Sequence, residues 1–225
     1  MNKRILLLLL IAFLTILLHA QQETYSKSEE IINLMEMAKS GDAMAQYQYG
    51  MVFFEGKFMP KNEKEAFQWF DAAAKQGLPE AYAALGLCYK DGLGVEKNIT
   101  EALKYFNLAA SKDNALAQFN LGVLYYNGEG VNANNKEAVK WFKLAAEQGN
   151  CNAQENLGLC YYEGTGLNID IEESYYWLSL AAALCPTEKA DEYVTNKERI
   201  MAELKPEKIE EIDKKVALWL EVHKK

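Results

Sequence analysis

The chain has 225 residues, of which 50% are hydrophobic and 25% are charged. This composition is that of a folded globular chain, and it excludes a disordered or collagen-like one. The 32 acidic residues outnumber the 24 basic ones, which gives a formal net charge of −8. Because an acidic surface repels phosphate groups, we expect no nucleic-acid partner.

Residues 1–20 are typical of a signal peptide. Lys3 and Arg4 precede an apolar run over residues 5–18, and Ala20 offers a small residue for cleavage. The run is shorter than the roughly 20 residues that a membrane-spanning helix needs, although a retained anchor is the alternative. We therefore expect a periplasmic or secreted protein that is not stably inserted in a membrane. Cleavage would leave 22 basic and 32 acidic residues, a net charge of −10.

Residues 21–41 are expected to form an N-terminal capping helix. Their apolar residues recur at helical spacing. Residues 37–41 read Met-Ala-Lys-Ser-Gly, and the similar Ala-Ala-Lys-Gln-Gly follows 36 positions later at residues 73–77. The segment is thus half of a repeat, and it would cover the open end of a stack of repeats.

A 36-residue period runs through residues 42–185, in copies at 42–77, 78–113, 114–149 and 150–185. One glycine recurs in every copy, as Gly50, Gly86, Gly122 and Gly158. An aromatic residue follows 19 positions later, as Trp69, Tyr105, Trp141 and Trp177. A fixed period of this length indicates stacked units, none of which can bury its apolar face alone.

Each copy predicts two antiparallel helices, A and B. The recurring glycine lies in the middle of helix A, where glycine costs roughly 1 kcal/mol relative to alanine. We attribute this repeated cost to close approach of a neighbouring helix backbone. A Gly-x-Gly-Val loop is expected to end helix A, since glycine adopts the left-handed conformation of a C-terminal cap. The expected N-terminal caps of helix B are Asn62, Asn98, Asn134 and Asp170.

The period changes after Cys185, and residues 186–225 are expected to form a C-terminal cap. Two helices are predicted there, at residues 190–204 and 206–222. Pro206 and Glu207 are both favourable in a first helical turn.

The repeat motif resembles that of a known family. Leu-Gly-x-x-Tyr-x-x-Gly-x-Gly-Val, followed by Glu-Ala-x-x-Trp/Tyr-Phe-x-x-Ala-Ala, is similar to the Sel1-like repeat, a relative of the tetratricopeptide repeat. The resemblance implies an all-α fold, a right-handed α-solenoid of about four helix-turn-helix repeats with a helical cap at each end. It also implies a scaffold for protein contacts, often exported, and it names no partner.

The inventory of reactive side chains argues against catalysis. Beyond residue 20 the only histidine is His223, so no histidine triad or zinc site can be built, and no serine has lysine three residues later. We expect no catalytic residue, metal or cofactor. The alternative comes from the resemblance, because some cysteine-rich Sel1-like proteins have been associated with β-lactam binding or hydrolysis.

The four cysteines leave two readings open. Cys151 and Cys185 could form a disulfide, because the start of one helix lies near the end of its antiparallel partner. The alternative is that Cys88, Cys151, Cys160 and Cys185 are all small buried apolar residues.

The resemblance places the A helices on the concave side, which is the expected binding groove for a peptide or protein segment. Aromatic side chains there are common interface anchors, and an acidic edge favours a partner with a basic stretch. The candidate groove residues are Tyr47, Phe54, Glu55, Lys90, Asp91, Phe119, Tyr126, Tyr162 and Glu163. By contrast, the aromatic residue three positions after each glycine is expected to pack between repeats: Phe53, Tyr89, Tyr125 and Tyr161.

Overall fold

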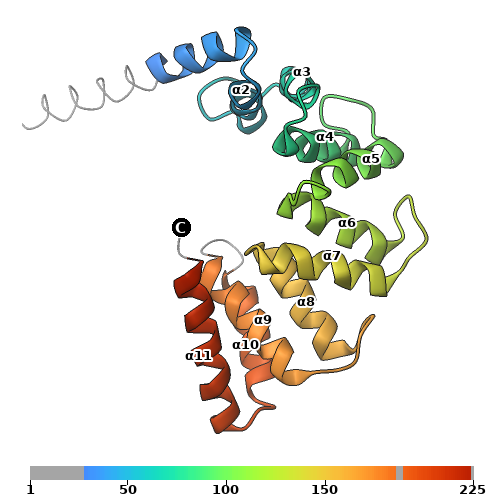
Figure 1. Ribbon diagram of the computed structural model, residues 1–225, viewed down its shortest axis with the longest axis vertical. Helices are drawn as coiled ribbons and strands as arrows, with labels where there is room; N and C mark the ends of the chain where they lie inside the picture. Colours follow the sequence, from blue (N-terminus) through green and yellow to red (C-terminus); the bar gives the residue numbers. More distant parts are fainter. Residues whose placement is uncertain (1–27, 186–189, 224–225) are drawn as a thin grey trace, which may run out of the picture. The chain divides into compact units, whose positions relative to one another are not determined.

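Figure 1 shows the computed structural model of the chain, which describes residues 28–185 and 190–223. Every regular element in these two ranges is a helix, as predicted. The chain divides into two compact units, the first ending at Leu78 and the second beginning at Pro79. The expected signal peptide at residues 1–20 lies outside the described residues. Within the described ranges, no helix is both long and apolar enough to span a bilayer.

The helices follow the predicted repeat. The first unit contains a helix over residues 28–39, then α2 (Ala43–Glu55) and α3 (Glu63–Ala74). The second unit contains α4 (Pro79–Asp91), α5 (Ile99–Ala110), α6 (Ala115–Asn127), α7 (Asn135–Glu147), α8 (Cys151–Glu163), α9 (Ile171–Leu184), α10 (Ala190–Met201) and α11 (Pro206–Val222). Helices A and B of each copy pack most extensively against each other: α2 with α3, α4 with α5, α6 with α7 and α8 with α9.

Both helices begin at a side-chain cap in three of the four repeats, whereas α4, which Leu78 precedes, begins with Pro79. The predicted caps of helix B are confirmed, since Asn62, Asn98, Asn134 and Asp170 each accept a hydrogen bond from the backbone N–H three residues later. Helix A has caps that were not predicted: Asp42, Asn114 and Asn150. Each cap satisfies one of the N–H groups that a helix start leaves without an intrahelical partner.

The loop between helices A and B is closed by the same backbone hydrogen bond in all four copies. Gly56, Gly128 and Gly164 end their A helices in the left-handed conformation, as predicted. The residue that caps helix B donates its backbone N–H to the carbonyl of the aromatic residue near the end of helix A, for example Asn134 to Tyr125 at 2.8 Å. The first loop, in which Phe58 replaces a glycine, has the same closing bond, from Asn62 to Phe53 at 3.0 Å, although Phe58 does not adopt the left-handed conformation of the glycines that it replaces.

Most of the glycines in the middle of the A helices lie against a different group from the one that we predicted. A Cβ atom added at Gly122 would lie 2.5 Å from the Phe142 ring, and Gly86 and Phe106 form the same pair. In these repeats the nearest neighbour is therefore the aromatic ring of the B helix in the same repeat, and not the backbone as we predicted. At Gly158 the nearest neighbours are the Leu178 side chain at 2.8 Å and the backbone oxygen of Ser174 at 3.2 Å, so the predicted backbone approach holds there. Gly50, Gly86 and Gly122 are needed because the ring lies directly on the A-helix backbone.

The helix over residues 28–39 acts as the second half of a repeat. The Gln46 side chain donates to the carbonyl of Ala38, eight residues earlier, at 3.2 Å. Gln154 makes the equivalent bond to Ala146 at 3.1 Å, where Ala146 lies near the end of the B helix α7. The half-repeat thus forms the same junction with α2 that a full repeat forms with its successor.

The C-terminal cap is built around α9, against which α10 and α11 both pack (Figure 1). Helix α10 ends at Met201, three residues before the predicted Leu204. Helix α11 has Pro206 in its first turn, as predicted. It runs parallel to α9: Lys208 near its start pairs with Glu172 near the start of α9 at 3.2 Å, and farther along both helices Tyr175 of α9 bonds to Asp213 of α11 at 3.0 Å.

Candidate functional site

The A helices of the second unit carry most of the predicted groove residues. Helices α4 and α6 lie against each other, and Lys90 Nζ crosses between them to Asn120 Oδ1 at 3.2 Å. Lys90 is also 3.7 Å from the Asp91 carboxylate. This lysine therefore joins two neighbouring repeats, and its charge is shared with its own acidic neighbour.

A cleft of about 140 Å³ lies between α6 and α8. Its wall includes the predicted groove residues Tyr126 and Glu163, and Tyr126 keeps 44% of its surface exposed. Phe119, also predicted, is not part of the cleft lining, and its ring lies 6.1 Å from the ring of Phe142. The full lining is Tyr126, Phe142, Asn156, Leu159, Cys160 and Glu163.

Glu163 supplies the charge of this cleft. The other ionisable groups in its lining are the Tyr126 phenol and the Cys160 thiol. Burial, and secondarily the charge of Glu163, raises the pKa of Cys160 to about 11. The thiol therefore keeps its proton at neutral pH and is a weak nucleophile. The cleft combines an apolar floor, an exposed aromatic ring and one carboxylate.

Tyr162 is engaged inside the chain. Its hydroxyl donates to Glu203 Oε1 at 2.8 Å, and the Arg199 guanidinium lies 4.9 Å from the centre of its ring. The hydrogen bond to Glu203 raises the pKa of Tyr162. Glu203 lies in the turn after α10, and two further bonds join α10 itself to α8, from Tyr193 to Asn152 and from Asn196 to Glu155. The half-buried Tyr162 side chain thus bonds to the C-terminal cap, and its role in binding a partner stays a prediction.

The first unit holds the remaining three predicted residues. The rings of Tyr47 and Phe54 lie 5.8 Å and 6.2 Å from the ring of Phe70. Glu55 is exposed and pairs with Lys57 at 2.8 Å. The two aromatic side chains are half-buried, so they contribute to packing as well as to the surface.

Cys151 and Cys185 are joined by a disulfide, with their Cα atoms 6.1 Å apart. The bond links the first residue of α8 to the residue that follows α9. It therefore closes the open end of the last helix pair. Among the described residues, no group of three or more histidine, cysteine, aspartate and glutamate side chains is arranged to hold a metal ion.

Sequence reasoning missed part of the cleft lining, namely Asn156 and the inner residues Phe142 and Cys160. Asn156 lies two residues before the recurring glycine, at the position that Asn120 has in the preceding copy. Comparing this position between copies could have identified it. Phe142 was recognised only as part of the buried pattern of helix B.

The repeat itself matches a known family. Residues 43–78, 79–114, 115–150 and 151–184 each match the Sel1 repeat. The chain belongs to the Sel1 repeat family. Each matched copy begins one residue later than the period predicted. Proteins built from Sel1 repeats are generally scaffolds for protein interactions.

Two solved structures are similar to this Sel1-repeat chain. One is a protective antigen of uropathogenic Escherichia coli, with 40% identity and a TM-score of 0.63 over 68% of this chain and 33% of the antigen. The other is a Sel1 repeat protein from Oxalobacter formigenes, with 30% identity and a TM-score of 0.63 over 73% of this chain and 47% of that one. This chain thus matches about a third of the length of the antigen and about half of the length of the Oxalobacter formigenes protein. No curated protein matches the chain.

Proposed function

We propose that this chain is a non-catalytic scaffold of the cell envelope, or a secreted one, that binds a peptide or protein segment along its A helices. The observation that carries the proposal is the cleft between α6 and α8, with the exposed Tyr126 ring at its wall. Tyrosine is enriched among interface anchors because it offers a large contact area with few rotatable bonds.

The partner that fits this cleft carries a basic residue beside an uncharged stretch. Glu163 is an exposed carboxylate at the cleft, and the chain as a whole is acidic. Attraction between a basic segment and this face acts over roughly a Debye length of 8–10 Å at physiological salt. Binding should therefore weaken as the salt concentration rises.

A photo-crosslinking experiment tests the proposal in the native cell envelope. A benzophenone-bearing phenylalanine replaces Tyr126 in one variant and Leu144 in a control variant, because Leu144 is similarly exposed, at 43%, but lies on the B helix α7. We expect a discrete crosslinked protein from position 126 only, and less of it when Glu163→Gln is added. Equal products from both positions would place the binding face elsewhere.

Two further measurements test the other parts of the proposal. Mass spectrometry of the exported, epitope-tagged protein should show that about 20 residues have been removed. Finding residues 1–20 intact on a cytoplasmic protein would contradict export. Purified protein should leave a chromogenic β-lactam unchanged, and turnover of that compound would overturn the scaffold proposal.

A further inference from the structure

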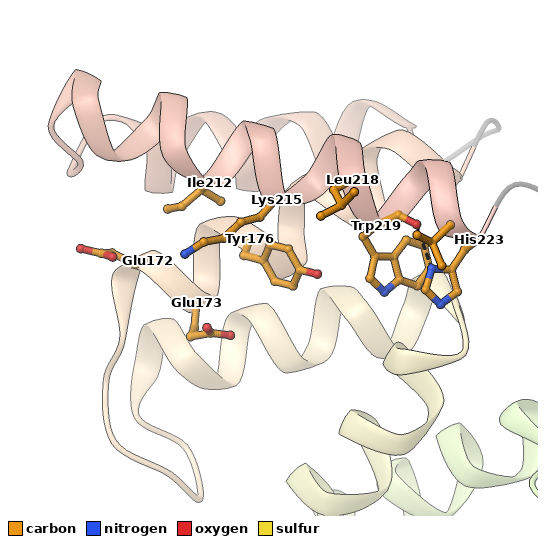
Figure 2. A pocket seen from close by; sticks show the side chains of 9 residues that line it. Glu172, Glu173, Tyr176, Ile212, Lys215, Leu218, Trp219 and His223 are labelled. Atoms are coloured by element: carbon orange, nitrogen blue, oxygen red, sulfur yellow. Dashed lines mark hydrogen bonds between the residues drawn. The ribbon is translucent and has the colours of Figure 1, made fainter.

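A second and larger pocket, of about 380 Å³, lies between α9 and α11 (Figure 2). It is separate from the cleft between α6 and α8, with which it shares no lining residue. Helix α9 supplies two acidic residues and a tyrosine, and α11 supplies most of the apolar wall. The lining consists of Glu172, Glu173, Tyr176, Ile212, Lys215, Leu218, Trp219, Val222 and His223.

The apolar wall of this pocket is unusually open to solvent. Leu218 and Val222 keep 62% and 72% of their surfaces exposed. Between them the Trp219 indole is held in place, because the His223 ring stacks on it at 3.8 Å and Gly149 leaves room for its edge. Exposed apolar side chains gathered at a pocket are typical of an interaction site, whereas single ones scattered on a surface are not.

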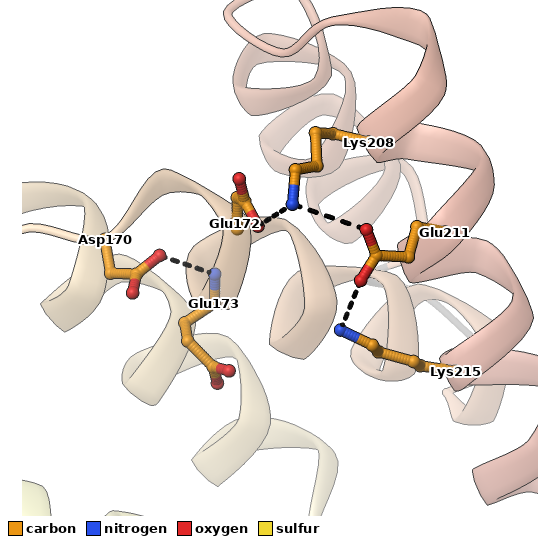
Figure 3. Close-up of polar contacts among 6 residues, drawn as sticks. All are labelled: Asp170, Glu172, Glu173, Lys208, Glu211 and Lys215. Atoms are coloured by element: carbon orange, nitrogen blue, oxygen red, sulfur yellow. Dashed lines mark hydrogen bonds and ion pairs between the residues drawn. The ribbon is translucent and has the colours of Figure 1, made fainter.

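Most of the charges at the pocket neutralise one another (Figure 3). Lys208 lies 3.2 Å from Glu172 and 3.3 Å from Glu211, and Lys215 lies 2.9 Å from Glu211. The two lysines lower the pKa of Glu211 through their hydrogen bonds and charges. Two carboxylates and two ammonium groups form a network of zero net charge, so the network offers little attraction to a further ion.

Glu173 is the exception. Its Oε2 accepts a hydrogen bond from the neutral Trp177 indole at 3.2 Å, and its backbone N–H is bound by the Asp170 cap. Within residues 28–185 and 190–223, no lysine or arginine forms an ion pair with it. The pocket thus places one uncompensated carboxylate next to an apolar wall.

We infer that the pocket between α9 and α11 is a second docking site, for a peptide segment in which a bulky apolar side chain lies next to an arginine or lysine. The apolar side chain of the peptide covers Leu218 and Val222. Its arginine or lysine forms an ion pair with the Glu173 carboxylate. The site is independent of the proposed function of the α6–α8 cleft, because the two have different walls and different acidic residues.

Fluorescence anisotropy with labelled peptides tests this inference. The probe has a central leucine–arginine pair flanked by glycine and serine. Two matched peptides replace arginine by glutamate or leucine by serine. We expect saturable binding of the leucine–arginine peptide and at least about fivefold weaker binding of each matched peptide. Equal affinity for all three peptides, or no saturable binding of the probe, would overturn the inference.

Variants of the protein locate the site. Glu173→Gln keeps an acceptor for Trp177 but removes the charge, and Leu218→Ser changes a side chain that is mostly exposed, so neither should disturb folding. Each should weaken binding of the probe at least about fivefold. Glu221→Gln makes the same charge change on α11 outside the pocket, and Tyr126→Ala changes the other cleft, so both should bind like the parent chain. Equal losses in Glu173→Gln and Glu221→Gln would show general charge attraction and contradict the site.

A second copy of the chain is the competing occupant. Sedimentation velocity of the parent chain and of Leu218→Ser distinguishes it. We expect the same sedimentation coefficient for both proteins at every concentration. A dimer of the parent chain that Leu218→Ser dissociates would replace the peptide site with a contact between copies.

Discussion

The Phe142 ring lies so close to the Cα of Gly122 that a Cβ atom there would be 2.5 Å from two of the ring carbons. An alanine in the middle of a helix is normally favoured over glycine by roughly 1 kcal/mol. At this position alanine should be less stable than glycine, because its Cβ would force the Phe142 ring, which is only 1% exposed, out of its packed position.

We expect Gly122→Ala to lower the free energy of unfolding by about 1–3 kcal/mol, the usual cost of overpacking. Thermal and urea unfolding followed by circular dichroism would measure it. The double variant Gly122→Ala with Phe142→Leu should lose less stability than the two single losses added together. Additive losses would show that the ring and the glycine do not act as a pair.

The cap at the start of α7 should contribute measurably to stability. Asn134 accepts the Glu137 N–H at 3.1 Å, and loss of such a cap costs about 0.5–2 kcal/mol. We expect Asn134→Ala to lower the melting temperature and Asn134→Asp to preserve it. Asn132→Ala, at an exposed position of the same loop, is the control and should melt like the parent chain. Equal losses in both alanine variants would refute the cap.

The disulfide between Cys151 and Cys185 should stabilise the last helix pair. It closes a loop with a sequence separation of 34, for which chain entropy gives about 3–4 kcal/mol at 25 °C. We expect dithiothreitol to lower the melting temperature of the parent chain and of Cys160→Ala. It should have no effect on Cys151→Ser. A parent chain that is insensitive to the reductant would contradict the stabilising role.

Tyr175 should make the fold sensitive to alkali. Burial, and then its hydrogen bond to Asp213, raise the pKa of Tyr175 to about 12, whereas an unfolded tyrosine ionises near pH 10. The folded state therefore keeps a proton that the unfolded state loses. The stability that this proton contributes is fully present below pH 10 and is lost as the pH rises towards 12.

The variant Tyr175→Phe isolates this effect. At pH 8–9 it should melt below the parent chain, because the 3.0 Å bond to Asp213 is gone. The difference in melting temperature between the two proteins should narrow between pH 10 and pH 12. Absorbance at the tyrosinate band should also show one fewer late-ionising phenol in the variant. A difference in melting temperature that stays constant from pH 10 to pH 12 would contradict the raised pKa of Tyr175.

Much of the fold could be predicted because its determinants are local. The 36-residue period, the caps such as Asn134 and the left-handed glycines such as Gly128 depend on residues only a few positions apart. The contact at Gly122 was harder to predict, because the sequence shows that a side chain is missing there but not which neighbour fills the space. Only the packing of α6 against α7 shows that Phe142 does so.

The candidate site was less predictable for a different reason. Tyr126 and Glu163 were identified by their place in the repeat, whereas the role of Tyr162 depends on α10, which lies outside the period. The bonds of α10 to α8 join residues 41 positions apart, such as Tyr193 and Asn152. Likewise, the pocket at Trp219 depends on how α11 lies on α9, and no repeated pattern in the sequence specifies that arrangement.

The equivalent bonds of Gln46 to Ala38 and of Gln154 to Ala146 have an evolutionary consequence. The junction that leads into the first repeat and the one that leads into the fourth use the same donor and the same acceptor position. A gene duplication or deletion of the three units between these two junctions would therefore rejoin residues that already match. The length of the array, and with it the number of A helices offered to a partner, can change in a single genetic step without the invention of a new interface.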